Sequence, residues 1–311
     1  MKSFNMLHLK KKLLGRTGLD GWLGKSFLYG LLIIIGFVYL FPLIKMFTYS
    51  MKDLEDLVSP NVEWIPTKLY FDNYRSSWIV LNYAKTLFFS LSVTLIPALV
   101  QTITTSITGY ALAKFKIKFK FVVFGLILIT YLLPQQVYLI PKFVLFSEMG
   151  LLQTIWAIIL PASVGQGLSS SIFILIFYQF FRMQPLQLDE AAEMDGANPY
   201  QTFILVGVPL ALPAYLSSFL FSFVWYWNET YVSSLFLGEN PITNVTIDTL
   251  QLKLLKFSTQ FGQTPGLSQA MANEAVRYSA TILIILPVLV TYLLLQKWFV
   301  ESIDKTGVTG E

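Results

Sequence analysis

Residues 182–213 read RMQPLQLDEAAEMDGANPYQTFILVGVPLALP and form the most specific local pattern in this 311-residue chain. The stretch contains one basic residue and four acids, which gives it a local charge of −3. Pro185 suits a position at or just before the start of a helix, and Gly196 can end that helix with a positive φ angle. Asn198 followed by Pro199 can begin a second short helix. We therefore predict a helix–turn–helix with small residues and carboxylates exposed.

The sequence on both sides of this stretch is strongly apolar. Hydrophobic residues make up 55% of the chain and charged residues only 13%, about half the ~25% of an ordinary soluble domain. A helix that crosses a bilayer needs about 20 mostly apolar residues. The long apolar runs predict an all-α integral membrane protein with six transmembrane helices, at about 26–48, 86–113, 121–141, 152–180, 209–232 and 278–298.

The six predicted spans form a single transmembrane domain over residues 26–300. A basic segment, 1–25, precedes this domain, and a short tail, 301–311, follows it. No small-residue cleavage site clearly follows the first span, so we expect this span to be retained. Another uncharged run, 257–273, contains Gln, Gly, Ser and Pro and is predicted to be a loop.

Composition also excludes several classes of site. The chain has no cysteine, which excludes disulfides, iron–sulfur clusters and thiol catalysis, and its single histidine is His8. One histidine makes a multi-histidine metal site or a Ser-His-Asp enzyme improbable. We therefore expect neither a metal site nor catalytic residues in this chain, and we predict that it is not an enzyme.

Positive charge is distributed unequally between the two sides of the predicted domain. With the N-terminus inside, 13 Lys and Arg residues lie in the inner segments and 7 in the outer ones, although the outer ones are longer in total. The positive-inside rule then predicts that both termini are cytoplasmic. The run Lys114, Lys116, Lys118 and Lys120 becomes a short cytoplasmic turn, which we favour over a nucleic-acid patch.

The acidic stretch resembles a known signature. Glu190-Ala191-Ala192, then Gly196, then Val206 and Val208-Pro209 resemble the EAA motif of binding-protein-dependent ABC importer permeases, which usually have Ile and Leu at the two valines. The longer run EAAEMDGANPYQTFILVGVPLALP looks like the carbohydrate-uptake branch of that family. This resemblance implies the type I ABC importer permease fold.

Other segments carry the same resemblance over roughly residues 70–311. Phe71-Asp72-Asn73-Tyr74 resembles a DNY element of the first outer loop, and Trp227-Asn228-Glu229 resembles an element of the fifth span. The run Gln296-Lys297-Trp298-Phe299-Val300 resembles the end of the shorter, MalG-like subunit of maltose-type permeases.

The resemblance implies how the chain would be driven. The EAA loop, 182–209, would be a coupling helix seated in a cleft of a cytoplasmic ATPase subunit, where Glu190 would pair with a basic residue. The ATPase-coupling residues would be Glu190, Ala191, Ala192, Asp195 and Gly196. ATP and Mg²⁺ would be used by the partner ATPase subunits, and no cofactor is expected on this chain.

The implied partners are a second, related permease in a heterodimer, two ATPase subunits, an extracytoplasmic solute-binding protein, a sugar substrate and membrane lipid. No nucleic acid is expected. The implied location is the cell (inner) membrane of a bacterium or archaeon, as a multi-pass protein. The implied function is ATP-driven import of a sugar or oligosaccharide.

A possible substrate path lies at the end of the fifth span, where aromatic rings could stack on sugar C–H faces and amides could bind hydroxyls. Its candidate residues are Trp225, Tyr226, Trp227, Asn228, Glu229 and Tyr231. An aromatic belt at the outer interface is the alternative explanation of these rings. Glu229 could be a functional intramembrane charge, but its place near the outer end of the span favours a solvated acid at least as much.

Three other functions stay open. The same machinery could import a polyol or a glycerophosphodiester-type solute. A stand-alone secondary transporter would need intramembrane charges or matching broken helices, and the spans carry only the terminal Lys45 and Glu229. A membrane-embedded enzyme would need paired carboxylates or metal ligands at membrane depth, whereas the acids gather on an inner loop.

Overall fold

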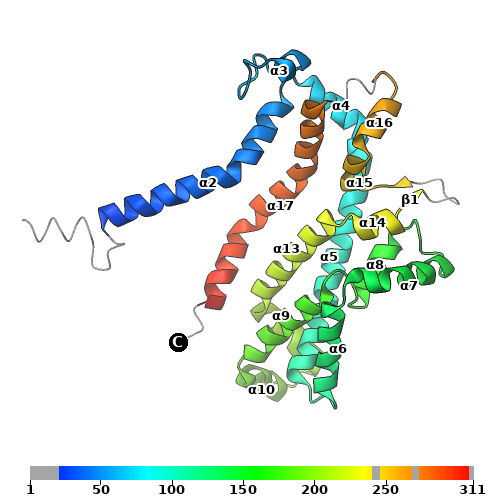
Figure 1. The fold of residues 1–311 in the computed structure, drawn as a ribbon. Coiled ribbons are helices and arrows are strands. Elements are labelled where there is room, and N and C mark those ends of the chain that lie inside the picture. Colours follow the sequence, from blue (N-terminus) through cyan, green and yellow to red (C-terminus); the bar gives the residue numbers. More distant parts are fainter. Residues whose placement is uncertain (1–20, 240–245, 268–272, 308–311) are drawn as a thin grey trace, which may run out of the picture. The chain divides into compact units, whose positions relative to one another are not determined.

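A computed structural model describes residues 21–239, 246–267 and 273–307, which are predominantly helical (Figure 1). The chain divides into two compact units: residues 1–77 with 270–282, and residues 78–269 with 283–311. Most of the basic segment 1–25 and the last four residues of the tail lie outside the described residues.

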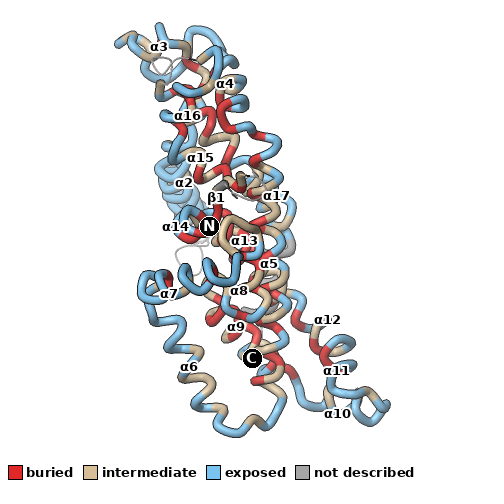
Figure 2. Tube along the Cα trace, turned by 90° about the vertical axis from the view of Figure 1, so that its right-hand side faces the viewer, coloured by how far each residue is buried: buried red, intermediate tan, exposed pale blue. Residues whose placement is uncertain are grey.

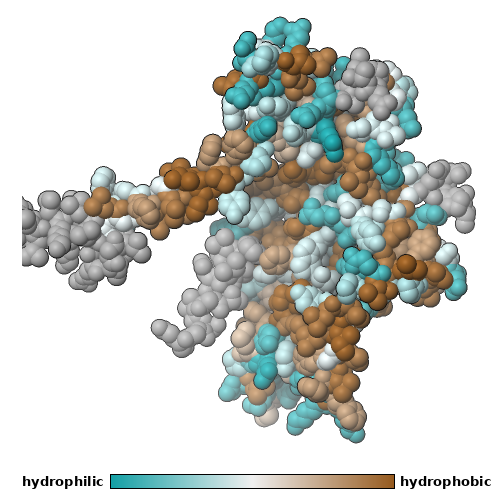
Figure 3. All heavy atoms as spheres, viewed as in Figure 1, coloured by the Kyte–Doolittle hydropathy of each residue, from teal (hydrophilic) through white to brown (hydrophobic). Residues whose placement is uncertain are grey.

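The first unit is built on an apolar helix and a polar cap. Helix α2 (Trp22–Ser50) is apolar along most of its length and almost wholly exposed, as expected for a helix in lipid (Figure 1). Figure 3 shows one face of it, on which hydrophobic residues gather. Helix α3 (Leu54–Val58), most of α4 (Asp72–Leu81) and the first residues of α17 (Glu274–Gly307) complete this unit.

Buried hydrogen bonds hold the polar cap together. Asn73, in the DNY element, donates from Nδ2 to the carbonyl oxygens of Ser50 at 3.0 Å and Lys52 at 2.8 Å. The hydroxyls of Ser77 and Ser279 lie 2.7 Å apart and connect α4 to α17. The asparagine therefore joins the end of α2 to the start of α4.

The second unit is organised around α5 (Tyr83–Lys114), against which α8 (Trp156–Ser163), α9 (Ser170–Met183) and α13 (Leu212–Asn228) pack. Gly109 on α5 allows α9 to approach closely, because an added Cβ would lie 2.6 Å from Phe177 Cβ on α9. Next to it is a cluster of buried side chains made of Tyr110, Phe177, Phe181, Phe203, Ala211 and Ala214. Figure 2 marks the buried stretches of the chain in red.

Two of the predicted spans are interrupted by breaks. The span predicted at 121–141 is two helices, α6 (Lys120–Leu132) and α7 (Gln135–Glu148), which meet at 95°. Pro134 lies at the bend, and Leu133 before it is extended because proline disfavours the helical conformation of its predecessor. The span predicted at 152–180 is divided into α8 and α9, with Ser169 in the left-handed region.

The span predicted at 209–232 also begins at a bend. Helix α11 (Pro199–Thr202), the π-helix η1 (Phe203–Gly207) and α12 (Val208–Leu210) run together and meet α13 at 77°. Among the described residues, α2, α5 and Glu274–Lys297 of α17 are long and apolar enough to cross a membrane, and the two bent pairs raise the possible total to five. A mostly helical fold with long apolar helices is thus confirmed, and six spans stay a prediction.

The remaining elements follow α13 in the chain. They are α14 (Tyr231–Phe236), the antiparallel strands β1 (Gly238–Glu239) and β2 (Thr246–Ile247), α15 (Leu250–Leu255) and α16 (Phe257–Gln263). The loop predicted over 257–273 is wrong at its start, where α16 is helical. Phe257 and Phe261 are both buried and four residues apart, so burial of one face of this helix overrides its polar composition.

Candidate functional site

The acidic stretch folds as the predicted helix–turn–helix. Helix α10 (Leu186–Met194) begins directly after Pro185, and its C-cap Asp195 is followed by Gly196, whose φ is +87°. The N–H of Ala197 donates to the carbonyl of Ala192 at 2.9 Å, and the N–H of Gly196 donates to that of Glu193 at 3.0 Å. These two bonds form a Schellman motif, which requires the left-handed residue that glycine provides without strain.

The second short helix starts with a capping box. Asn198 Oδ1 accepts from the N–H of Gln201 at 3.0 Å, and Gln201 Oε1 accepts from the N–H of Asn198 at 2.8 Å. Pro199 occupies the first turn, where a missing N–H costs no hydrogen bond. The turn between α10 and α11 is therefore fixed at both of its ends.

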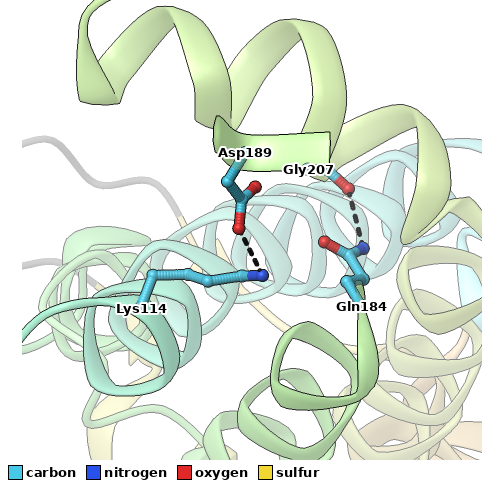
Figure 4. Close-up of polar contacts among 4 residues, drawn as sticks. All are labelled: Lys114, Gln184, Asp189 and Gly207. Carbon is cyan, nitrogen blue, oxygen red and sulfur yellow. Dashed lines mark hydrogen bonds and ion pairs between the residues drawn. The ribbon is translucent and has the colours of Figure 1, made fainter. Parts of the chain in front are cut away.

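Helix α10 combines one anchored carboxylate with several exposed side chains. The side chains of Glu190, Ala191 and Glu193 are exposed, whereas Asp189 is nearly buried. Asp189 Oδ2 lies 2.6 Å from Nζ of Lys114, the last residue of α5 (Figure 4). The acidic helix is thus held against the end of a membrane helix while its other carboxylates stay accessible.

Two further contacts hold the acidic stretch, residues 182–213, in place within the second unit. Gln184 is buried, and its Nε2 donates to the carbonyl of Gly207 at 3.4 Å (Figure 4). Gly207 itself faces the ring of Tyr110, which a Cβ would approach to 3.3 Å. Sequence reasoning treated Lys114 as one of four lysines in a turn and missed its ion pair. Asp189 itself gave no signal of this pair, because an acid in the first turn of a helix is expected from the helix dipole alone.

The aromatic residues at the end of α13 do not share one face. Tyr226 is buried, and its hydroxyl donates to Gln101 Oε1 at 2.6 Å and accepts from the N–H of Leu168 at 3.2 Å. Gln101 Nε2 closes the ring by donating to the carbonyl of Leu168 at 2.7 Å. Trp227 is 3% exposed, and the ring of Trp225 lies 5.1 Å from that of Phe173.

The other three candidates lie at the helix end. Asn228 Nδ2 donates to the carbonyl of Val224 at 2.9 Å, and Glu229 Oε1 accepts from the N–H of Val232 at 2.6 Å at the start of α14. Tyr231 is half exposed and lines a groove with residues of α7. Tyr226 and Glu229 share the lining of one small pocket of about 30 Å³, so a role in a substrate path stays a prediction.

Next to that pocket is a cavity of about 570 Å³ with mixed lining. It is bounded by residues of α6, α7 and α8, the α8–α9 connection and the start of α9. Its polar side chains include Gln135, Tyr138, Lys142 and Gln166. In the part of the chain that the structure describes, no group of three His, Cys, Asp or Glu residues could hold a metal ion.

Comparison with known proteins agrees with this architecture. Residues 82–305 match the family described as binding-protein-dependent transport system inner membrane component. The chain belongs to this family. It is a permease subunit of an ABC importer and a multi-pass membrane protein. The predicted family, the non-enzymatic role and the membrane location are therefore confirmed.

Several relatives of this permease match over nearly their whole lengths. The polygalacturonan/rhamnogalacturonan transport system permease protein YtcP of Bacillus subtilis is 26% identical over 91% of this chain and 97% of its own. The lactose transport system permease protein LacG of Rhizobium radiobacter is 27% identical over 88% and 93%. The trehalose transport system permease protein SugB of Mycobacterium tuberculosis is 28% identical over 89% and 95%.

A solved structure shares the fold. It is the crystal structure of a bacterial ABC transporter involved in the import of the acidic polysaccharide alginate, and the matched chain is 23% identical to this permease. The TM-score is 0.68, and the match covers 89% of this chain and 96% of the other. The type I permease fold implied by the sequence is therefore supported over most of the chain.

Proposed function

We propose that this permease forms part of the path by which an ATP-driven importer moves a sugar or oligosaccharide, and that the α10–α11 loop couples it to the ATPase. The relatives' names support the substrate class, since they refer to lactose, trehalose, arabinooligosaccharides and polygalacturonan/rhamnogalacturonan. The observation that carries the coupling role is the anchored helix α10, with Asp189 facing inward and Glu190 and Glu193 exposed.

This arrangement suits the transfer of force. An exposed, acidic helix can enter a basic cleft, where each carboxylate can form a charge-assisted hydrogen bond. The ion pair between Lys114 and Asp189 would pass a displacement of α10 to α5, the helix around which the second unit is packed. Coupling over such a distance needs a rigid element with two arrangements, and a capped helix–turn–helix is rigid.

The proposal also includes a membrane topology and a set of partner subunits. In the proposal, the loop at 182–209 and both termini lie in the cytoplasm, and the bent pairs α6–α7 and α12–α13 count among six spans. Partners are a second permease, two ATPase subunits that use ATP and Mg²⁺, and an extracytoplasmic binding protein. The contacts of the ATPase subunits with Glu190, Ala191, Ala192, Asp195 and Gly196 are part of the same proposal.

The test is reconstitution. The permease would be co-expressed with the genes adjacent to its own, placed in liposomes, and supplied with binding protein and a panel of labelled sugars. The proposal predicts sugar uptake that needs ATP and is abolished by Glu190→Ala while the complex still assembles. Uptake of a polyol or glycerophosphodiester alone would overturn the substrate class, and uptake without ATPase subunits would overturn the coupling.

A further inference from the structure

The cavity of about 570 Å³ in the second unit has a chemical composition that points to a ligand. Its volume lies within the roughly 300–1,000 Å³ typical of small-molecule sites. Its walls combine amide, hydroxyl and aromatic side chains with apolar ones. Sugars need both kinds of wall, because they present hydroxyls at their edges and C–H groups on their faces.

Lys142 is the one charged side chain in this lining, and no acid accompanies it there. Among the described residues, the one ion pair within 4.0 Å joins Lys114 to Asp189, which lie on other elements. No described carboxylate therefore lies within 4.0 Å of Nζ of Lys142. Its Nζ lies 5.3 Å from the ring centroid of Phe146 and 5.7 Å from that of Phe236. Such contacts attract a cation only weakly compared with a carboxylate.

One carboxylate, that of Glu229, lines the small neighbouring pocket together with Lys142. Its Oε1 accepts the N–H of Val232 in the first turn of α14 at 2.6 Å, and it forms no ion pair with Lys142 within 4.0 Å. A partly buried ammonium group without a paired anion is unfavourable, because burial removes hydration that nothing replaces. A bound anion would remove this penalty for Lys142.

We propose that this cavity binds an acidic sugar residue, a uronate, whose carboxylate pairs with the ammonium group of Lys142. Gln135 and Gln166 offer donors and acceptors for ring hydroxyls, and Tyr138 offers an aromatic face. Ser170, also in the lining, is buried and its hydroxyl has no hydrogen-bond partner, so it supplies a further polar group to a ligand. This inference rests on the proposed sugar import and narrows its substrate class.

The site differs from the one expected from sequence. The aromatic candidates on α13 are absent from this lining, and only Tyr226 and Glu229 reach the adjoining small pocket. The cation that would select an acidic substrate comes from α7, beyond the bend at Pro134. Without that bend, Lys142 would lie on a helix continuing straight from α6 and not beside the α8–α9 connection.

The experiment measures equilibrium binding to the assembled importer in nanodiscs of zwitterionic lipid, without binding protein. The two ligands are digalacturonate and a neutral galactose disaccharide of the same linkage. Lys142→Gln removes the charge and Lys142→Arg keeps it, and Lys256→Gln is the control because Lys256 is exposed and outside the cavity. Loss of one charge-assisted contact predicts a rise of about tenfold or more in the Kd of digalacturonate for Lys142→Gln.

The expected pattern is tighter binding of the acid than of the neutral sugar, lost in Lys142→Gln and kept in Lys142→Arg and in the control. Equal binding of the two sugars, or a Kd for digalacturonate unchanged by Lys142→Gln, overturns the proposal. If the uronate site fails this test but the importer still takes up neutral sugars, the proposed importer function stands. Failure of the uronate site is thus distinguishable from failure of the proposed function.

An anionic lipid headgroup is the competing source of a negative group. The same titration in nanodiscs with phosphatidylglycerol, with bound lipid counted by native mass spectrometry, separates the two. Lipid retention that depends on Lys142, without preference for digalacturonate, overturns the uronate site. A uronate preference that is the same in both lipids supports it.

Discussion

Nζ of Lys114 lies 2.6 Å from Oδ2 of Asp189, so the last residue of the central membrane helix α5 is joined directly to the acidic helix α10 (Figure 4). The two side chains are only 9% and 14% exposed, which removes most of the screening that weakens surface ion pairs. The pair therefore anchors α10 through one nearly buried carboxylate, while Glu190 and Glu193 stay exposed.

Breaking this ion pair should uncouple transport. Asp189→Asn or Lys114→Gln leaves one nearly buried charge unpaired, which costs roughly 3–5 kcal/mol. We expect each substitution to lower the sugar transported per ATP hydrolysed, and the double variant to be no worse than either single one. Proteoliposome assays of both quantities check this.

The matched control is Lys118→Gln, which removes a charge from the same turn at an exposed position. It should keep the transport stoichiometry of the unaltered permease. Additive losses in the Lys114 and Asp189 variants would show that the two side chains act independently.

Gly196 is needed for its backbone conformation and not for space. Its φ is +87°, and an added Cβ would have nothing within 4 Å. Gly196→Ala should therefore destabilise the α10–α11 turn by about 1–2 kcal/mol, Gly196→Asn by less, and Gly196→Pro by more. Binding-protein-stimulated ATP hydrolysis should fall least in Gly196→Asn, more in Gly196→Ala and most in Gly196→Pro. Gly125→Ala, in open space at negative φ, should leave this hydrolysis unchanged. Equal activity of the alanine and proline variants would contradict this account of the turn.

Tyr226 distinguishes a structural from a substrate-binding role on α13. Tyr226→Phe leaves Gln101 Oε1 and the N–H of Leu168 without the hydroxyl, which should cost about 1–3 kcal/mol of stability. We expect a lower Tm and an unchanged KM for the sugar. A higher KM at unchanged Tm would instead place the hydroxyl in the substrate path.

The polar cap of the first unit should be sensitive to acid. Asp56 accepts from Oγ1 of Thr67 at 2.7 Å and from its N–H at 2.8 Å. The hydroxyl bond of Thr67 is the largest cause that holds the pKa of Asp56 below its usual 3.8, with smaller help from Lys52 and against the effect of burial. A lowered pKa stabilises the folded form above the usual pKa, and this stabilisation is lost as pH falls through the lowered value.

Hydrogen exchange over residues 52–70 measures that loss. We expect protection of this segment to decline below about pH 4 in the unaltered permease, and to be lower and nearly independent of pH in Asp56→Asn. Identical pH profiles for the two proteins would show that the carboxylate does not stabilise the cap.

The short-range features of the loop could be predicted because single residues determine them. Pro185, Gly196 and Asn198 each specify a local backbone state, and the structure places each where the sequence does. The ion pair of Asp189 with Lys114 could not be predicted, because it joins residues far apart in the chain. Membrane character was readable from composition, since apolar runs of sufficient length have few other uses.

The breaks within spans were not predictable in the same way. Proline in a membrane helix is compatible with continuity, so Pro134 and Pro42 look alike in sequence, yet α2 continues through Pro42 whereas α6 and α7 separate at Pro134. The difference lies in packing, which sequence periodicity does not show. Helix α16 was not predicted for the same reason, because packing of two buried phenylalanines holds this polar segment in a helix.

The most direct test of the coupling role is a cross-link. The chain has no cysteine, so Ala191→Cys places a unique thiol in this subunit on the exposed side of α10. In the assembled importer with a cysteine-free ATPase carrying one cysteine in its basic cleft, a short bismaleimide should join the two subunits. Ala84→Cys, exposed near the start of α5, should give no product. A thiol at residue 191 that stays free in the full complex would contradict the coupling role of this loop.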